Sequence, residues 1–279
     1  MSVTVSPRIG VCSWSLQPKN LDELVGQLAG LKLERLQLGL DPLRTDPDSW
    51  EDAALRLRDA GVSVVSGQFG AVGEDYTTPQ TIRATGGVVP DETWPANREN
   101  ADATAELARQ LGLTLLSTHA GFIPPDESEP VFAKLVGRVR TLAELFAQRC
   151  GAKLLLETGQ ETADTLNRFL LAVDRPNVGV NFDPANMLLY DMGDPVESVR
   201  RLMSHVRQVH IKDATPPSTP GSWGEEVVVG DGAVDWAAFL GELDASGYDG
   251  SLVIESEAGT QRAEDIATAA RRLNVWLDK

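Results

Sequence analysis

Four side chains of the types that hold divalent metal ions stand at comparable places in the sequence, each at the end of a short apolar run. The four are Glu157, Asp183, His210 and Glu255, and the runs are 154–156, 178–182, 206–209 and 252–254. Three carboxylates brought together repel one another strongly unless a cation lies among them. Carboxylate oxygens with one imidazole suit Mn²⁺, Mg²⁺ or Co²⁺ better than a thiolate-seeking ion, and Zn²⁺ remains compatible. If these side chains meet, we expect them to hold one divalent cation.

The apolar runs themselves predict how the four side chains are positioned. They are rich in Val, Leu and Ile and lack helical spacing, which is typical of buried parallel strands. A stretch with helical spacing follows each run, and such alternation indicates a parallel sheet. Functional groups in these sheets lie at the carboxyl ends of the strands. We therefore expect all four side chains at one edge of one sheet.

The same alternation extends over the whole chain of 279 residues. Strands are expected to begin near Arg8, Leu33, Val62, Leu113, Lys153, Val178, Val206 and Ser251, the first running over 8–16. Helices are expected over 21–31, 48–60, 96–111, 130–150, 162–173, 195–206, 234–247 and 263–277, with Asn20 capping the first and Gly112 ending the third. Two irregular stretches, 70–95 and 214–232, interrupt the pattern, and such segments are usually functional or mobile.

Eight strand–helix units without a linker predict an α/β fold, a single (β/α)₈ TIM barrel over residues 1–279. An open doubly wound sheet is the alternative. It would normally carry a glycine-rich phosphate turn after the first strand, and residues 12–15 (CSWS) are not one.

The overall composition limits the kinds of molecule that the protein is expected to bind. The formal net charge of −16 disfavours a nucleic acid or an anionic membrane, because phosphate contacts require an excess of Lys and Arg. No apolar run approaches transmembrane length, and no targeting segment opens the sequence. Cys12 and Cys150 are far apart in the chain, so we expect reduced thiols and a cytoplasmic setting.

Seven pieces of the sequence together resemble the xylose-isomerase-like barrel superfamily of sugar isomerases and epimerases. They are GVCSWSL (10–16), STHAG (117–121), LLLETG (154–159), VNFDPANM (180–187), VRQVHIKDA (206–214), GDGAVDW (230–236) and LVIESEAG (252–259). The likeness covers nearly the whole chain. It implies a small-molecule carbohydrate substrate.

The resemblance also implies roles. Ketose 3-epimerases of this superfamily hold one metal with Glu, Asp, His and Glu from strands five to eight, which correspond here to Glu157, Asp183, His210 and Glu255. The two glutamates then form an acid/base pair on either face of the substrate. A proton on a carbon beside a carbonyl is too weakly acidic to leave unaided, and a metal stabilises the enediolate that forms.

Four further residues are expected to contact the substrate: Trp14, His119, Asn186 and Lys212. Trp14 belongs to a motif of the superfamily and could form an apolar wall, whereas His119 ends the fourth strand. Two of them depart from the resemblance. Asn186 stands where those epimerases have a histidine, and Lys212 is the only basic residue near the place of an arginine. Both departures affect residues that bind the ketose in those epimerases, so they argue for a different substrate here.

Structural interpretations stay open for several residues. Alternate residues of a strand share a face, so Lys212 should point the same way as His210, and Glu257 the same way as Glu255. An ion pair of Lys212 with Asp213 or a barrel carboxylate is the alternative to substrate binding. His119 is about equally well explained as a structural histidine, and Trp14 and Trp223 as ordinary packing. His205 precedes the seventh strand, on the opposite face, and is interpreted as structural.

The leading functional hypothesis is a metal-dependent sugar isomerase or epimerase acting through proton transfer beside a carbonyl. A metal-dependent lyase acting on a keto sugar or keto-inositol is the second, either inosose dehydratase-like or eliminating from a 3-keto-glycoside. The superfamily includes inosose dehydratases, and an enediolate beside a leaving group expels it. An endonuclease IV-like nuclease needs a three-zinc cluster built from many histidines, and the chain has three. An inactive sugar-binding protein is the fourth. A homodimer is expected only by analogy with other barrels.

Overall fold

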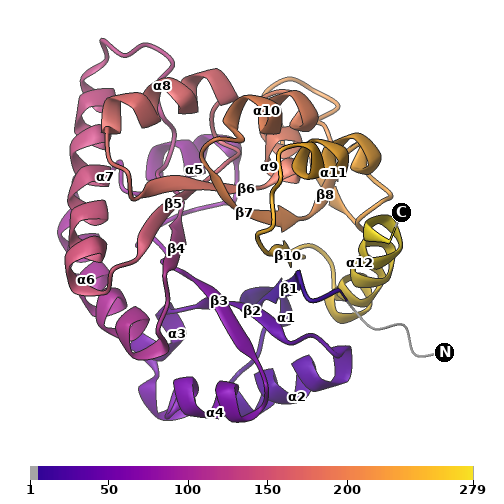
Figure 1. The fold of residues 1–279 in the computed structure, drawn as a ribbon. Coiled ribbons are helices and arrows are strands. Elements are labelled where there is room, and N and C mark those ends of the chain that lie inside the picture. The colour runs from indigo at the N-terminus through magenta and orange to yellow at the C-terminus, as the bar shows by residue number, and fades with distance from the viewer. Residues whose placement is uncertain (1–5, 279) are drawn as a thin grey trace.

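Eight parallel strands close into a barrel at the centre of the molecule (Figure 1). The structure, a computed structural model, describes residues 6–278. Around the barrel the strands lie in the order β1-β10-β7-β6-β5-β4-β3-β2. Their bounds are β1 Ile9–Cys12, β2 Arg35–Gly39, β3 Ser63–Gln68, β4 Leu115–Thr118, β5 Lys153–Glu157, β6 Val178–Phe182, β7 Val206–Ile211 and β10 Leu252–Ile254. The predicted (β/α)₈ barrel is therefore confirmed.

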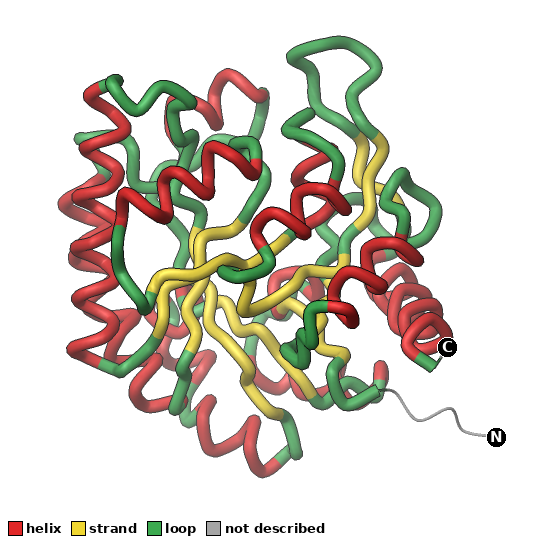
Figure 2. Tube along the Cα trace, turned by 45° about the horizontal axis from the view of Figure 1, so that its top comes forward, coloured by secondary structure: helices red, strands yellow, loops and turns green. Residues whose placement is uncertain are grey.

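Helices surround the strands, which lie enclosed in the middle of the tube drawing (Figure 2). The longer ones are α2 Leu21–Leu31, α4 Ala53–Asp59, α6 Trp94–Leu111, α7 Pro130–Arg149, α8 Ala163–Val173, α10 Pro195–Leu202, α11 Trp236–Ala245 and α12 Arg262–Leu277. Their apolar faces pack on the barrel through aromatic pairs such as Phe69 with Phe146, whose ring centres are 6.3 Å apart. No helix within residues 6–278 combines the length and the apolarity needed to cross a membrane.

Local sequence signals fix several helix ends as expected. The Asn20 side chain accepts a hydrogen bond from the Glu23 backbone N–H at 2.9 Å, so it caps α2. Gly112 ends α6 with a φ of +67°, a conformation that favours glycine. Both predicted helix ends are confirmed.

Two predicted elements are shorter or divided. The first strand stops at Cys12, and the short helix α1 (Ser13–Leu16) replaces its second half. There the Ser13 hydroxyl accepts a hydrogen bond from the Gly39 N–H at 2.9 Å, which turns the chain away from the barrel. The helix expected over 48–60 is split into the 3₁₀ turn η1 (Pro47–Trp50) and α4, because Asp52 between them adopts a φ of +56°.

The two stretches predicted to be irregular contain regular structure. The first includes α5 (Pro79–Thr85), which Thr78 and Thr81 start with reciprocal capping hydrogen bonds. The second contains an antiparallel ribbon, β8 (Asp213–Thr215) paired with β9 (Glu225–Val227), which projects beyond the barrel in Figure 2. Short helices α3 (Asp41–Thr45) and α9 (Pro184–Leu189) also follow β2 and β6 directly. All these additions lie after the carboxyl ends of barrel strands.

The Asp213 carboxylate anchors the base of the ribbon. It accepts hydrogen bonds from the backbone N–H groups of residues 214, 230, 232 and 234 and from Trp236 Nε1 at 2.8 Å. A Cβ at Gly232 would collide with this carboxylate, so the backbone approaches as closely as it does because the residue is glycine. The segment is therefore held firmly at its base.

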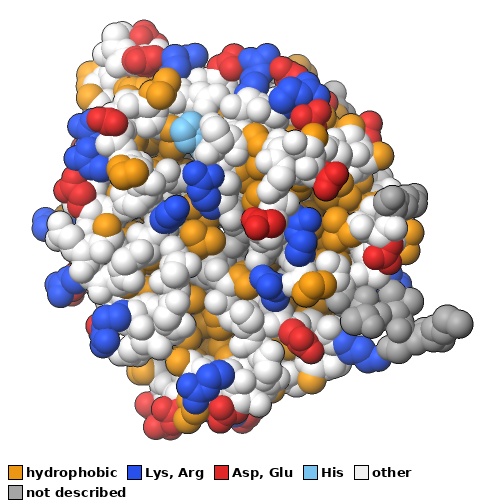
Figure 3. Space-filling model, viewed as in Figure 1, with side chains coloured by type: hydrophobic (Ala, Val, Ile, Leu, Met, Phe, Trp, Pro, Cys, Tyr) orange, Lys and Arg blue, Asp and Glu red, His pale blue; other side chains and the backbone are white. Residues whose placement is uncertain are grey.

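The face of the molecule seen in Figure 3 mixes acidic and basic side chains with uncharged ones, without a patch of one sign. The net charge of −16 is consequently not displayed there as a single acidic surface.

Candidate metal centre and active site

The structure brings the four predicted metal ligands together at the carboxyl ends of β5, β6, β7 and β10. One potential ligand atom from each of Glu157, Asp183, His210 and Glu255 lies within 4.8 Å of all the others, and all four residues are buried. They come from positions up to 98 residues apart, since Glu157 and Glu255 are the extremes of the set. The parallel register of adjacent strands is what makes their ends coincide.

His210 is the geometric centre of the cluster. Its Nδ1 lies 3.5 Å from Glu157 Oε1, from Asp183 Oδ2 and from Glu255 Oε2. Nδ1 and Asp183 Oδ2 are both buried and make no hydrogen bond within the described residues. Buried polar atoms are almost always satisfied, so these two point to a missing partner. Carboxylate oxygens around an imidazole nitrogen form a donor set that fits a divalent cation.

The far side of the His210 ring is held by side-chain amides. Gln37 Oε1 lies 2.7 Å from His210 Nε2, and the Asn181 amide lies 2.9 Å from the same nitrogen. Gln37 Oε1 also accepts from Gln208 Nε2 at 2.7 Å, whereas Gln37 Nε2 donates to the Ser117 hydroxyl at 2.6 Å. Gln37 Oε1 only accepts and favours a ring proton on Nε2, whereas Asn181 Nδ2 only donates and favours an unprotonated Nε2. The tautomer with the proton on Nε2 is the one that leaves the Nδ1 lone pair facing the carboxylates, where a cation would bind.

These amides belong to a polar layer inside the barrel, directly below the cluster. Gln37, Ser117, Asn181 and Gln208 are each fully buried, at 0% exposure. Cys12 belongs to the same layer, with its Sγ 3.7 Å from His210 Nε2, on the side away from Nδ1. Burial raises the pKa of the Cys12 thiol and so favours its neutral form.

Asp183 serves two purposes because it ends a strand and begins a helix. Its Oδ1 accepts a hydrogen bond from the Asn186 backbone N–H at 3.0 Å and caps α9, while Oδ2 faces the cluster. The Asn186 side chain in turn donates to Glu157 Oε1 at 3.1 Å. The α9 start, which sequence reasoning missed, therefore explains how the segment 183–186 presents two polar groups to one site.

Lys212 forms buried ion pairs with the carboxylates at the end of β10. Its Nζ lies 2.9 Å from Glu255 Oε2, 2.7 Å from Glu257 Oε2 and 3.7 Å from Glu226 Oε2. Burial opposes the charge, but Glu255 and Glu257 raise the pKa of Lys212 well above its usual value. Pairing with a barrel carboxylate is thus what the structure shows, and the predicted alternative of a pair with Asp213 is wrong, because Asp213 holds the ribbon.

Trp14 completes the surroundings of Glu255. Its Nε1 donates to Glu255 Oε1 at 2.7 Å, so each oxygen of Glu255 has a hydrogen-bond donor. Burial would raise the pKa of Glu255, yet Lys212 and His210 hold the pKa well below its usual value. Trp14 lies in α1 rather than in the first strand, and it lines the cavity.

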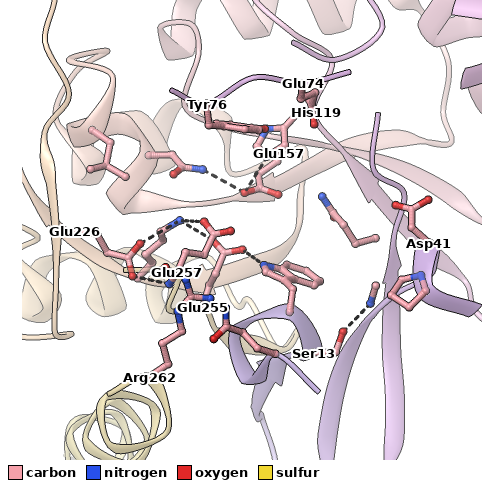
Figure 4. A pocket seen from close by; sticks show the side chains of 18 of the residues that line it. Ser13, Asp41, Glu74, Tyr76, His119, Glu157, Glu226, Glu255, Glu257 and Arg262 are labelled. Carbon is pink, nitrogen blue, oxygen red and sulfur yellow. Dashed lines mark hydrogen bonds and ion pairs between the residues drawn. The ribbon is translucent and has the colours of Figure 1, made fainter. Parts of the chain in front are cut away.

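His119 lies on the other side of the cluster, beside Glu157. Its Nε2 is 3.7 Å from Glu157 Oε1, and the Tyr76 ring stands edge-on to it with ring centres 6.4 Å apart. Figure 4 shows Glu74 and Tyr76 next to His119 above Glu157. Burial lowers the pKa of His119, but Glu157 and Glu74 outweigh it, so the pKa is raised. Burial also raises the pKa of Glu74, which His119 opposes.

A cavity of about 720 Å³ opens above the cluster. Trp14, His119, Asn186 and Lys212 all line it, together with the further aromatic residues Trp50, Tyr76, Tyr190 and Trp223. Its carboxylates are Asp41, Glu74, Glu157, Glu226, Glu255 and Glu257. The structure therefore places six of the eight predicted site residues on the wall of this cavity, whereas the metal ligands Asp183 and His210 are fully buried and do not line it. His205 is not among the lining residues; it lies just before β7, as expected.

Comparison with known proteins places this arrangement in a family. The family described as xylose isomerase-like TIM barrel matches residues 29–278. The chain belongs to that family. A solved xylose isomerase domain protein from Planctomyces limnophilus is similar over 96% of both chains, with 33% identity and a TM-score of 0.86.

Two curated relatives of this xylose isomerase-like barrel are similar over shorter stretches. An inosose dehydratase from Clostridium botulinum is 25% identical over 153 residues, which cover 49% of this chain and 51% of that protein. A ketose 3-epimerase from Arthrobacter globiformis is 28% identical over 124 residues, covering 44% and 36%. The chain thus spans about half the length, or less, of the curated relatives it matches.

Several polar groups of this xylose isomerase-like barrel escaped sequence reasoning. Gln37 lies between Leu36 and Leu38, and Asn181 lies between Val180 and Phe182, and such a polar interruption of an apolar run is a signal that could have marked them as facing the interior. Glu74, Tyr76 and Glu226 lie in the segments expected to be irregular, where no periodicity indicates which side chains point inward. Their positions became apparent only in the folded chain.

Proposed function

We propose that this protein is a divalent-metal-dependent enzyme that moves a proton beside the carbonyl of an uncharged keto sugar or sugar derivative, as an isomerase or epimerase. The observation that carries the proposal is the buried four-ligand cluster beside a cavity large enough for a sugar. In it His210 Nδ1 and Asp183 Oδ2 make no hydrogen bond to any of the residues 6–278 that the structure describes. The similarity to a ketose 3-epimerase supports it.

The chain's own residues would share the work as follows. Glu157 and Glu255 approach the cavity from different sides in Figure 4, so one can remove a proton from a carbon and the other can return one on the opposite face. Asn186 and His119 hold Glu157, whereas Trp14 and Lys212 hold Glu255. A divalent cation bound by the four ligands would supply stabilisation of the negative charge that develops beside the carbonyl.

The charges of the cavity favour an uncharged substrate. Four carboxylates beyond Glu157 and Glu255 line it, from Asp41, Glu74, Glu226 and Glu257. Two lining residues are cationic: Lys212, which pairs with Glu255 and Glu257, and Arg262, which donates to the Glu257 backbone carbonyl. A phosphate or carboxylate on the substrate would therefore face six lining carboxylates against these two cations, one of them already paired.

Elimination is the second candidate, and Lys212 favours it. The Lys212 ammonium lies 2.9 Å from Glu255 at the rim of the cluster and would be able to give a proton to a leaving hydroxyl. Glu157 would take the proton from carbon, the C–O bond would break as the C=C bond forms, and water would leave. The similarity to inosose dehydratases supports this reading.

A deuterium-exchange assay tests the proposal. The protein is stripped with EDTA, reloaded with Mn²⁺, Mg²⁺ or Co²⁺, and incubated in D₂O with a panel of unphosphorylated ketoses and keto-inositols. NMR should show deuterium at a carbon beside the carbonyl, with an epimer, an isomer or an unsaturated ketone as product. The metal should also raise Tm, because it binds only the folded ligand set.

Two variants and a control sharpen this assay. Glu157→Gln and Glu255→Gln should each lower the exchange rate by about 10³-fold, because each removes an acid/base group. Glu264→Gln, which changes an exposed glutamate of α12, should leave the rate unchanged. Full activity in both active-site variants, or no stoichiometric metal by elemental analysis, would refute the proposed roles.

A further inference from the structure

A second, smaller cavity of about 160 Å³ adjoins the main one. It lies between α5, the end of α9 and the loop that joins β8 to β9. Pro79, Gln80 and Arg83 form its α5 side, and Gly221 and Ser222 form its ribbon side. Leu189, Tyr190 and Trp223 line both cavities, so these three side chains are the wall that the two spaces share.

Aromatic rings dominate this wall. The Tyr190 and Trp223 rings meet edge to face with centres 4.8 Å apart, and the Phe122 and Tyr190 rings do so at 5.9 Å. The Arg83 guanidinium lies over Phe122, 5.1 Å from the ring centre. Rings fixed against one another in this way offer a rigid apolar surface at little cost in side-chain entropy. Asp191 is the one carboxylate among its lining residues, whereas six line the main cavity.

The polar groups at this wall are only weakly engaged. The Tyr190 hydroxyl has Gln160 Nε2 as its hydrogen-bond partner at 3.5 Å, and Gln80 Nε2 donates to the Gly221 carbonyl at 3.5 Å. Both distances lie at the outer limit of a hydrogen bond, so both groups stay able to bond a ligand hydroxyl. Apolar rings with a few convergent polar groups are the usual composition of a small-molecule site.

The volume of the main cavity indicates a ligand larger than one sugar ring. A space of about 720 Å³ falls in the range of roughly 300–1,000 Å³ that encloses drug-sized ligands. A single sugar ring is smaller than such ligands and would leave part of the space above the metal ligands unfilled. Tyr190 and Trp223 line both this space and the smaller cavity, so a ligand larger than one sugar ring could contact them.

We propose that the smaller cavity is a subsite for a second, uncharged ring joined glycosidically to the reacting sugar, so that the substrate class is a keto-glycoside and not a free monosaccharide. The reacting ring lies over Glu157 and Glu255, and the second ring packs its apolar face against Tyr190, Trp223 and Phe122. This inference rests on the proposed function and specifies its substrate. An aryl aglycone and a second pyranose share the required chemistry, an uncharged ring with an apolar face.

Calorimetric titration with unreactive glycosides tests the subsite without any turnover. Metal-loaded protein is titrated with methyl β-D-glucopyranoside, phenyl β-D-glucopyranoside and cellobiose, and with the corresponding α-anomers. At least one ring-bearing glycoside should bind roughly tenfold more tightly than its methyl counterpart, because the added ring gains aromatic contact. The phenyl and cellobiose arms distinguish an aryl aglycone from a second sugar.

Substitutions of residues that line the smaller cavity test whether the preference for ring-bearing glycosides arises there. Phe122→Ala should abolish the tenfold preference, Phe122→Tyr should retain it, and Val275→Ala, an exposed position on α12, should leave it unchanged. Ser222→Trp, which fills the cavity from the exposed ribbon tip, provides a second test should Phe122→Ala fail to fold. The preference should then disappear while the methyl glycoside affinity stays as in the parent protein.

Two results would overturn the subsite. One is equal affinity for methyl and ring-bearing glycosides, including no detectable binding of either, and the other is a preference that survives both Phe122→Ala and Ser222→Trp. The proposed function fails separately. If the protein prefers ring-bearing glycosides but exchanges no deuterium into any keto sugar, the proposed function is wrong and the subsite stands. If it exchanges deuterium but shows no such preference, the subsite is wrong and the proposed function stands.

Discussion

The two glutamates of the cluster are the same residue type in different surroundings. Both oxygens of Glu255 accept hydrogen bonds shorter than 3 Å, from Trp14 Nε1 at 2.7 Å and from Lys212 Nζ at 2.9 Å. The donors around Glu157 are farther away, with Asn186 Nδ2 at 3.1 Å and His119 Nε2 at 3.7 Å. Burial raises the pKa of each glutamate, but the cations lower that of Glu255 further.

This difference indicates how one cluster can hold two carboxylates in separate roles. Environments that push two proton affinities apart are the usual way in which active sites assign acid and base. We infer that Glu255 begins the reaction in its charged form, as the base, and that Glu157, beside His119, is the carboxyl that more readily supplies a proton. Substitutions on one side of the cluster at a time test whether that difference between Glu157 and Glu255 is real.

The largest expected effect is on the Glu255 side. Lys212→Met should lower the free energy of unfolding by about 4 kcal/mol, because it leaves Glu255 and Glu257 close together without their buried counter-charge. Urea denaturation of metal-free protein measures the loss. Added Mn²⁺ should restore part of it. Lys153→Met, an exposed lysine at the start of β5, is the control. A loss below about 1 kcal/mol would show that the pair is not tightly held.

A smaller effect is expected on the Glu157 side, at Glu161. Burial raises the pKa of Glu161 to about 8, against an opposing effect of His119. Because the folded-state pKa is raised, folding favours the protonated carboxyl. The stability it contributes is present below the unfolded pKa of 4.5 and is lost as the pH rises through about 8.

Glu161→Gln should therefore match the parent protein near pH 5 and exceed its stability near pH 8.5, by on the order of 3 kcal/mol. Denaturation curves across this pH range measure the difference. Parallel curves for the two proteins at every pH would mean that the Glu161 carboxyl titrates as it does in water. Glu264→Gln, an exposed position, should show no pH-dependent difference.

The smallest expected effect comes from one hydrogen bond. Trp14→Phe removes the Nε1–H that donates to Glu255 Oε1 and keeps most of the ring, so stability should fall by about 1 kcal/mol. It should also shift the acid limb of the pH–rate profile upward, since Glu255 loses a donor to its charged form. Trp50→Phe, another tryptophan of the cavity wall, should leave that limb in place. Identical profiles in both variants would contradict the role given to Trp14.

The barrel and its ligand set were predictable because their signals are periodic. The length and composition of the apolar runs predict strands, and the carboxyl end of a barrel strand is where functional residues lie. Four of these runs end in Glu157, Asp183, His210 and Glu255. Parallel register then brings those ends together with no further information from the sequence. The family resemblance suggested the chemistry to expect. The partner of Lys212 became apparent only in the structure, because spacing alone allowed both Asp213 and a barrel carboxylate.

The segments after the strand ends were the least predictable. Helices α5 and α9 and the β8–β9 ribbon are short, and their stability comes from caps and tertiary contacts more than from pattern. Glu226 illustrates the limit. It lies in the 214–232 stretch, yet its carboxylate accepts from the backbone N–H groups of Glu257 and Ala258, which follow a strand on another part of the chain. No local signal predicts such a contact.

The anchoring of the β8–β9 ribbon has an evolutionary and engineering consequence. Five hydrogen bonds to Asp213 and two to Glu226 fasten its base, while its tip around Gly221 and Trp223 borders both cavities. Mutations or insertions at the tip can accordingly alter which molecules are admitted without moving Glu157, Asp183, His210 or Glu255. For the proposed enzyme, selection for new substrates would be concentrated at that tip, and a library randomised there is the natural starting point for changing the ligands that the cavities accept.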